Sequence, residues 1–398
     1  MMRQTEVLQE IRKMRFLEVY DDWQSGRLSQ EEAGQLLGMG GRNFRRYIAR
    51  YREEGEAGLL DKRLTQASNR CAPVDEVLRL TELYRSRYDG WNVKHFYSFY
   101  QREHQGERSY TWVKNKLQEA KLVKKAKGKG KHRKKRERAA MEGMMIHQDA
   151  STHAWVEGQT WDLIITLDDA TSTHYSMFFV PEEGTMSSLQ GMKDVIEQHG
   201  IPSSFYSDRG SHYWHTPVAG GKVDKRNPTQ FGQAMQHLGI QMIAAYSPQA
   251  RGRCERMFST HQARIPHELK AAGITDMDTA NDYLKKTYMP AFNAEFSVKP
   301  AVESKAFVPW FGGSLDDILC ESLERIVNKD NIVSFKGRKL QIPSDEYRHH
   351  YVKAKVNIKR HIDGSLTLFH GPRKLAEFPA ITTEETKVVE QPTVMKMP

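Results

Sequence analysis

Residues 124–138 separate two parts of the chain that have different secondary-structure patterns. Lys or Arg occupies ten of these fifteen positions, and Gly128 and Gly130 lie among them. Charge repulsion and glycine favour an extended conformation, so the stretch predicts an interdomain linker. Lysine and arginine neutralise phosphates, so the linker is also expected to contact DNA. The residues expected to make this contact are Lys131, Arg133, Lys134 and Lys135.

The overall charge favours a polyanionic partner. The 398 residues carry a formal net charge of +10, which most simply indicates nucleic-acid binding. At roughly 150 residues per domain, the length predicts two to four domains. Three distant cysteines show neither a disulfide framework nor a zinc spacing, which favours a reducing compartment. No apolar run reaches the ~18 residues of a membrane span, and the polar N-terminus does not resemble a signal peptide. A cytoplasmic, nucleoid-associated protein is expected.

Residues 1–60 predict a helix-turn-helix domain. Ser29 and Glu32 have the spacing of a capping box that begins a short helix. Gly38 and Gly40 then supply a turn before a basic helix with an apolar stripe. In a helix-turn-helix the second helix enters the major groove; the alternative is a helical hairpin with a solvated basic face. The arginines expected to contact DNA are Arg42, Arg45, Arg46 and Arg50.

Residues 61–123 predict a second helical DNA-binding domain. Apolar residues recur at helical spacing in three segments: Val74–Arg87, Val93–Glu103 and Tyr110–Ala120. In the third segment Lys114 and Lys116 lie off the apolar face, where they can reach DNA. A single helical bundle without a DNA-binding role fits the same pattern.

Residues 144–297 predict an α/β domain, because strands and helices alternate there. The expected strands are 161–169, 173–180, 203–207 and 240–245, and the expected helices are 185–199, 228–238, 250–265 and 276–296. A connector at 298–325 leads to short strands at 326–381, which predict a small β-barrel. The basic linker spans 124–143 in this division, and 382–398 is expected to be a disordered tail.

Three acidic residues could hold metal ions in the α/β domain. Asp149 precedes the first strand pair, Asp208 ends a short strand, and Glu255 begins a helix. Such carboxylates suit two divalent cations about 3.5–4 Å apart, which would stabilise the attacking and leaving oxygens of a phosphate displacement. Asp168 and Asp169 also follow a strand; a tight turn is the favoured interpretation for them, and a position near the metals is the alternative.

Several motifs resemble a known family over nearly the whole chain. They are Phe205–His212, Tyr246–Arg256, Leu167–Thr171 and Gly220–Lys225. The chain is similar to DDE transposases of the retroviral-integrase superfamily, most of all to bacterial insertion-sequence transposases of the ISNCY group. The resemblance implies a ribonuclease-H-like core in which Asp149, Asp208 and Glu255 are catalytic acids holding two Mg²⁺ ions, with Mn²⁺ as the alternative metal. It also implies that Arg251, Arg253 and Arg256 approach the phosphates of the transposon end.

The function implied is DNA transposition by a homo-oligomer that is at least a dimer. The protein would bind the terminal inverted repeats, cleave the element ends and transfer them to target DNA by a 3′-hydroxyl. A domesticated DNA-binding protein, a metal-dependent nuclease without joining activity and a transcription regulator are the alternatives. The 46 residues between Asp208 and Glu255 exceed the usual spacing of integrase-like cores. This excess predicts an inserted loop near Tyr213–Asn227.

Overall fold

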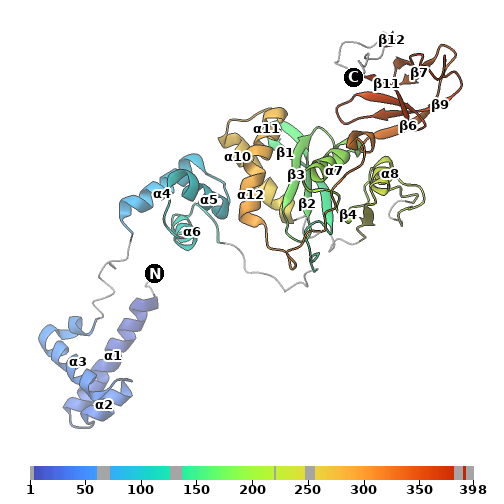
Figure 1. The fold of residues 1–398 in the computed structure, drawn as a ribbon. Coiled ribbons are helices and arrows are strands. Elements are labelled where there is room, and N and C mark those ends of the chain that lie inside the picture. The colour runs from blue at the N-terminus through green and yellow to red at the C-terminus, as the bar shows by residue number, and fades with distance from the viewer. Residues whose placement is uncertain are drawn as a thin grey trace. The chain divides into compact units, whose positions relative to one another are not determined.

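A computed structural model of the chain falls into two compact units. Unit 1 contains residues 1–87 and 115–122, and unit 2 contains 88–114 and 123–398. Figure 1 traces the elements of both. The residues described are 4–60, 72–125, 137–218, 221–246, 256–380 and 389–390. The seven segments into which the sequence divides the chain stay predictions.

The first helices of unit 1 form a helix-turn-helix arrangement. They are α1 (Gln4–Gln24), α2 (Gln30–Leu36), α3 (Gly41–Glu54) and η1 (Gly55–Leu59), and α4 (Val74–Arg87) follows. The predicted capping box begins α2: the Glu32 amide donates to Ser29 Oγ (3.3 Å), and the Ser29 amide donates to Glu32 Oε2 (2.8 Å). Gly38 has a φ of 67° in the turn, which glycine adopts at little cost. Buried aromatic and aliphatic side chains join α1, α2 and α3: Phe16, Tyr20, Ala33, Phe44 and Ile48.

Unit 2 is built on a five-stranded mixed sheet. Its strands are β1 (Ile146–Val156), β2 (Gln159–Asp168), β3 (His174–Val180), β4 (Ser204–Ser207) and β5 (Gln241–Ala244). The order across the sheet is β3-β2-β1-β4-β5. Hairpin-connected β1, β2 and β3 are antiparallel, whereas β4 and β5 run parallel to β1. The mixed sheet fits the integrase-like α/β core that was expected.

Helices cover both faces of this sheet (Figure 1). On one face, α7 (Thr185–His199) and α8 (Gln230–His237) pack through a core that includes Leu189, Phe205 and Phe231. On the other face, the helical residues 256–262 are followed by three named helices. These are α10 (Ile265–Ala271), α11 (Met277–Tyr283) and α12 (Met289–Phe296), with the π-helical turn η3 (Leu284–Tyr288) between the last two. The helices α5 (Val93–His104) and α6 (Tyr110–Glu119) precede the sheet in the chain.

The position of Asp149 differs from the prediction. It lies inside β1, opposite Ile165 of β2, rather than ahead of the strand pair. Polar side chains fill the middle of β1, so the apolar alternation that marks a half-buried strand is absent from its sequence. The strand forms because β2 pairs with it along its length and β4 pairs with its first residues.

The C-terminal strands form two sheets around one core. The element η4 (Leu315–Asp317) precedes them. The strands are β6 (Glu321–Ile326), β7 (Ile332–Phe335), β8 (Arg338–Gln341), β9 (Lys355–Arg360), β10 (Leu366–His370), β11 (Arg373–Phe378) and β12 (Val389–Glu390). One sheet has the order β11-β10-β9-β6 and the other β12-β8-β7. The predicted barrel is therefore not confirmed: among the described residues the strands do not close into one sheet. Every described helix is too short or too polar to cross a membrane.

Candidate active site

Asp149 lies in β1, and Asp208 lies directly after the end of the neighbouring parallel strand β4. The register of β1 with β4 ends at His147 opposite Tyr206, and two further residues lead to Asp149 and Asp208. Side chains alternate between the faces of a strand, so Asp149 shares a face of β1 with His147. The His147 and Tyr206 rings lie 4.7 Å apart. Two of the three predicted acids therefore follow directly from a pair of neighbouring strand positions.

The helical residues 256–262 lie over this same face of β1. Gln262 Nε2 donates to Ser151 Oγ at 2.9 Å, and Ser151 is two positions beyond Asp149 on the strand. Phe258 packs into the core below. Glu255 immediately precedes this helical segment and lies outside the described residues. Among the described side chains no group of three His, Cys, Asp or Glu could hold a metal ion, so the three-acid site stays a prediction.

The two aspartates have a donor chemistry that suits a hard divalent cation. Mg²⁺ binds oxygen ligands and commonly uses one or two carboxylates. Asp149 Oδ1 accepts from the Ala150 amide at 3.1 Å, and Asp208 Oδ1 accepts from the Gly210 amide at 2.8 Å. A carboxylate offers about four acceptor positions, so neither hydrogen bond conflicts with metal binding.

A buried set of hydrogen bonds supports the acids from the opposite face of the sheet. Tyr213, five residues after Asp208, donates its hydroxyl to Gln148 Oε1 at 2.8 Å. Trp214 Nε1 donates to Ser207 Oγ at 3.0 Å. Thr229, the N-cap of α8, donates its hydroxyl to the Tyr213 carbonyl at 3.1 Å. Sequence patterns did not indicate a role for Tyr213 or Gln148. The local sequence around each residue does not show which distant residue it will hydrogen-bond.

Asp168 and Asp169 hold the backbone together, as the turn interpretation requires. Asp168 Oδ1 accepts from the Gly143 amide (2.9 Å), and Oδ2 accepts from the amide and hydroxyl of Thr171 (2.8 and 2.9 Å). Asp169 Oδ2 accepts from the Ala139 amide (2.7 Å), and Oδ1 lies 2.8 Å from His147 Nε2. Burial raises the pKa of Asp168 although these hydrogen bonds act to lower it. Both carboxylates therefore fasten the segment 139–143 to the sheet.

Only some of the residues predicted to contact DNA lie within the described part of the chain. On α3, Arg42, Arg45 and Arg46 are exposed, whereas the guanidinium of Arg50 lies 4.4 Å from the centre of the Tyr47 ring. In α6, Lys114 is half-buried, and Lys116 Nζ pairs with Glu119 at 2.7 Å. Arg256 is exposed at the start of its helix. The remaining candidates lie outside the described residues: Lys131, Arg133, Lys134, Lys135, Arg251 and Arg253.

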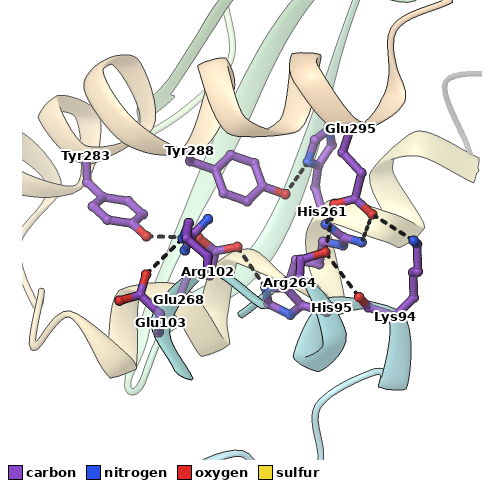
Figure 2. A network of polar contacts seen from close by, with 11 residues as sticks. Lys94, His95, Arg102, Glu103, His261, Arg264, Glu268, Tyr283, Tyr288 and Glu295 are labelled. Atoms are coloured by element: carbon purple, nitrogen blue, oxygen red, sulfur yellow. Dashed lines mark hydrogen bonds and ion pairs between the residues drawn. The ribbon is translucent and has the colours of Figure 1, made fainter. Parts of the chain in front are cut away.

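A chain of buried rings fixes the helices below the site. His174 Nδ1 lies 3.1 Å from the Ser172 carbonyl, and His174 Nε2 lies 3.0 Å from His261 Nε2. His261 Nδ1 lies 2.8 Å from the Tyr288 hydroxyl, as Figure 2 shows. Burial lowers the pKa of His174 to about 4 and lowers that of His261 well below its ordinary value. Both rings are therefore neutral at pH 7. One arrangement satisfies every atom: Tyr288 donates to His261, which donates to His174, which donates to Ser172.

The helix α5 contacts α10 and α12 through polar side chains (Figure 2). His95 Nε2 and Glu268 Oε1 lie 2.7 Å apart and are buried. Glu295 Oε2 accepts from Arg264 Nη1 at 2.9 Å and from Ser98 Oγ at 3.2 Å. These side chains line a cavity of about 340 Å³. The helix α5 is thus part of the same unit as the sheet.

Comparisons with known proteins find one domain family and two transposases. Residues 17–65 match the helix-turn-helix domain family HTH_28. "Putative transposase y4bF" of Sinorhizobium fredii is 27% identical over 379 residues, covering 89% of this chain and 78% of its own length. The transposase for insertion sequence IS1202 of Streptococcus pneumoniae is 30% identical over 237 residues, covering 58% of this chain and half of its own length.

Solved structures give more distant likenesses. The HTLV-2 integrase catalytic core domain in complex with magnesium is 13% identical, covers 37% of this chain and 87% of its own, and has a TM-score of 0.29. An intasome of simian T-cell lymphotropic virus in complex with PP2A regulatory subunit B56 gamma is 13% identical, covers 74% of this chain and 100% of its own, and has a TM-score of 0.33. By its sequence, the chain is similar to these two transposases, and its residues 17–65 match a helix-turn-helix domain family.

Proposed function

We propose that this chain is a DNA transposase that cleaves the ends of a mobile element and joins their 3′-hydroxyls to target DNA. The observation that carries the proposal is the parallel pairing of β1 with β4, which supports a shared role for Asp149 and Asp208. Sequence similarity to two transposases over 89% and 58% of the chain adds support.

In this proposal Asp149, Asp208 and Glu255 hold two Mg²⁺ ions, with Mn²⁺ as the alternative. Bound metals would lower the pKa of an attacking water or hydroxyl and stabilise charge on the phosphate. Arg42, Arg45 and Arg46 would bind the terminal inverted repeats through the major groove. Two ends must be held together for joining, so the active form would be at least a dimer. Its substrate would be chromosomal DNA in the cytoplasm.

The experiment uses duplexes made from the DNA that flanks the gene, with the 3′ end already cleaved, incubated with the full chain and Mg²⁺. Joined products are expected for the wild type. Asp208→Ala should keep end binding in a gel-shift assay and lose joining. Asp224→Ala is the matched control, because Asp224 also lies between Asp208 and Glu255 but its carboxylate accepts from the neighbouring Arg226 amide (2.8 Å) and Asn227 Nδ2 (2.7 Å).

The outcomes separate the alternatives. Hydrolysis without joining indicates a metal-dependent nuclease, and a shifted band without any cleavage indicates a DNA-binding protein or regulator. Strand joining by Asp208→Ala at the wild-type rate would overturn the assignment of the catalytic acids.

A further inference from the structure

Main-chain pairing between β1 and β4 stops before it reaches the two acids. The last paired residues are His147 and Tyr206. Asp149 remains in a strand, because β2 pairs with β1 as far as Val156. Asp208 instead begins a loop directly after β4. The position of Asp208 relative to Asp149 therefore depends on the contacts of that loop and not on strand pairing alone.

The Tyr213 hydroxyl provides such a contact. It donates to Gln148 Oε1 at 2.8 Å, and Gln148 immediately precedes Asp149 in β1. Both side chains are buried, with 2% and 1% of their surface exposed. The Tyr213 ring packs 5.5 Å from Phe205 and 5.1 Å from Phe231, measured between ring centroids. The loop that carries Asp208 is thus tied to the strand that carries Asp149.

The direction of this hydrogen bond is fixed by the other partners of the Gln148 amide. The Gln148 nitrogen donates to Thr166 Oγ1 at 2.8 Å and to the Ser188 carbonyl at 3.2 Å. A carbonyl can only accept, so the Gln148 oxygen faces the phenol, which donates to it. Burial raises the pKa of Tyr213 well above its ordinary value, and the nearby carboxylates of Glu183, Asp149 and Asp208 raise it further, so the phenol keeps its proton.

Space for Gln148 depends on a glycine in α7. A Cβ atom at Gly191 would lie 2.2 Å from Gln148 Nε2 and 2.7 Å from Thr166 Oγ1. Glycine inside a helix is less favourable than alanine. Here the missing side chain lets α7 approach the buried amide closely, so α7 limits where Gln148 can lie.

We propose that Tyr213 is a positioning residue whose hydrogen bond to Gln148 sets the spacing of the Asp149 and Asp208 carboxylates for divalent cations. The inference rests on the proposed function, because it gives these acids a metal-binding role. Loss of the hydroxyl would leave the ring packed and the fold intact while the Asp208 loop gains freedom. Metal affinity would fall, because ligands held by hydrogen bonds bind a metal more tightly than loosely held ones.

The test measures Mn²⁺ binding to the full chain by calorimetry, together with the Mg²⁺ dependence of strand joining. Tyr213→Phe should weaken Mn²⁺ binding by about 10- to 100-fold and raise the Mg²⁺ concentration needed for half-maximal joining. End binding should not change. Tyr175→Phe is the matched control: its buried hydroxyl donates to Glu142 at 2.6 Å, so it loses a similar bond that does not involve Gln148. Its Mn²⁺ affinity should equal that of the wild type.

Gly191→Ala disturbs Gln148 from the other side and should weaken Mn²⁺ binding in the same way. If Tyr213→Phe fails to fold, Gly191→Ala tests whether the position of Gln148 affects metal affinity. Wild-type Mn²⁺ affinity in Tyr213→Phe, or in Gly191→Ala when that variant alone folds, would overturn the positioning role. The proposed function would still stand if Asp208→Ala has lost Mn²⁺ binding and joining. Joining activity retained by Asp208→Ala would instead overturn the proposed function itself.

Discussion

His95 of α5 and Glu268 of α10 form a buried pair, with Nε2 and Oε1 2.7 Å apart, although 173 residues separate them in the sequence. Glu268 also accepts from the Tyr283 hydroxyl at 2.8 Å. Burial lowers the pKa of His95, and this outweighs the opposite effect of Glu268. His95 is therefore a neutral donor that joins α5 to the helices under the sheet.

Replacing Glu268 by Ala should destabilise unit 2. The buried donor on His95 would lose its acceptor, at about 1–3 kcal/mol for an unsatisfied buried group, and the part-buried Tyr283 hydroxyl would lose its acceptor as well. The free energy of unfolding, measured with denaturant, checks this. Lys94→Ala is the control, because Lys94 Nζ lies 4.0 Å from Glu295 on the surface and such pairs contribute about 0–1 kcal/mol. Equal effects of the two variants would contradict a structural role for the buried pair.

Acidification should destabilise the fold through His174 and His261. The folded-state pKa of His174 is about 4, and that of His261 is also depressed. An unfolded histidine has a pKa near 6.5, so below that value the unfolded chain binds protons that the folded chain does not. The free energy of unfolding is thus highest above pH 6.5 and falls as the pH decreases toward 4, with His174 contributing about 2 kcal/mol of that loss at pH 5.

Thermal unfolding at pH 7 and pH 5 measures this effect. His174→Gln removes one of the two titrating rings and should have a smaller shift of the unfolding temperature between the two pH values. A shift as large as that of the wild type would show that His174 does not remain neutral in the folded state.

Asp168→Asn should lower stability without removing metal binding. The amide group has one oxygen, whereas the two carboxylate oxygens of Asp168 accept from Gly143 and Thr171. At least one buried donor would then lack an acceptor, at about 1–3 kcal/mol. Unfolding temperature and Mn²⁺ calorimetry test both parts, with the exposed Asp278→Asn as control. Unchanged stability combined with lost Mn²⁺ binding would assign Asp168 to the metal site instead.

Arg46 and Arg50 are expected to have different roles, in DNA binding and in stability respectively, although only one turn of α3 separates them. Arg46 is exposed, so Arg46→Ala should weaken binding to end DNA and reduce the slope of log affinity against log salt by about 0.9 if it contacts one phosphate. Arg50 packs on Tyr47 at 4.4 Å, so Arg50→Ala should mainly lower the unfolding temperature of unit 1. Fluorescence anisotropy over a salt series, with thermal unfolding, distinguishes the two. A larger loss of DNA binding from Arg50→Ala would reverse these roles.

Local sequence signals predicted the regular elements well. The helix expected at 185–199 is α7 with the same bounds, and the capping box of Ser29 and Glu32 begins α2. Both depend on neighbouring residues: amphipathic spacing in α7 and a side-chain cap in α2. The barrel was not predictable in the same way, because strand lengths and turns do not determine which strands become neighbours across a core.

The site was only partly predictable for a related reason. The strand that leads to Asp208 was predicted correctly, because an apolar run marks it. The strand around Asp149 was missed because its polar residues face the site and its neighbours. The hydrogen bond between Tyr213 and Gln148 joins residues that are 65 positions apart in the sequence. Both side chains become buried only when the sheet has formed, so the local sequence could not predict this contact.

The hydrogen bond from Thr229 to the Tyr213 carbonyl joins the two ends of the stretch where the sequence predicts an inserted loop. Closing a loop costs chain entropy that grows only with the logarithm of its length, about 0.6 kcal/mol for each doubling. Residues can therefore be gained or lost beyond this closure at small cost, while the segment from Asp208 to Tyr213 keeps its length. Variation in the loop would alter the surface offered to DNA and leave the acids where they are.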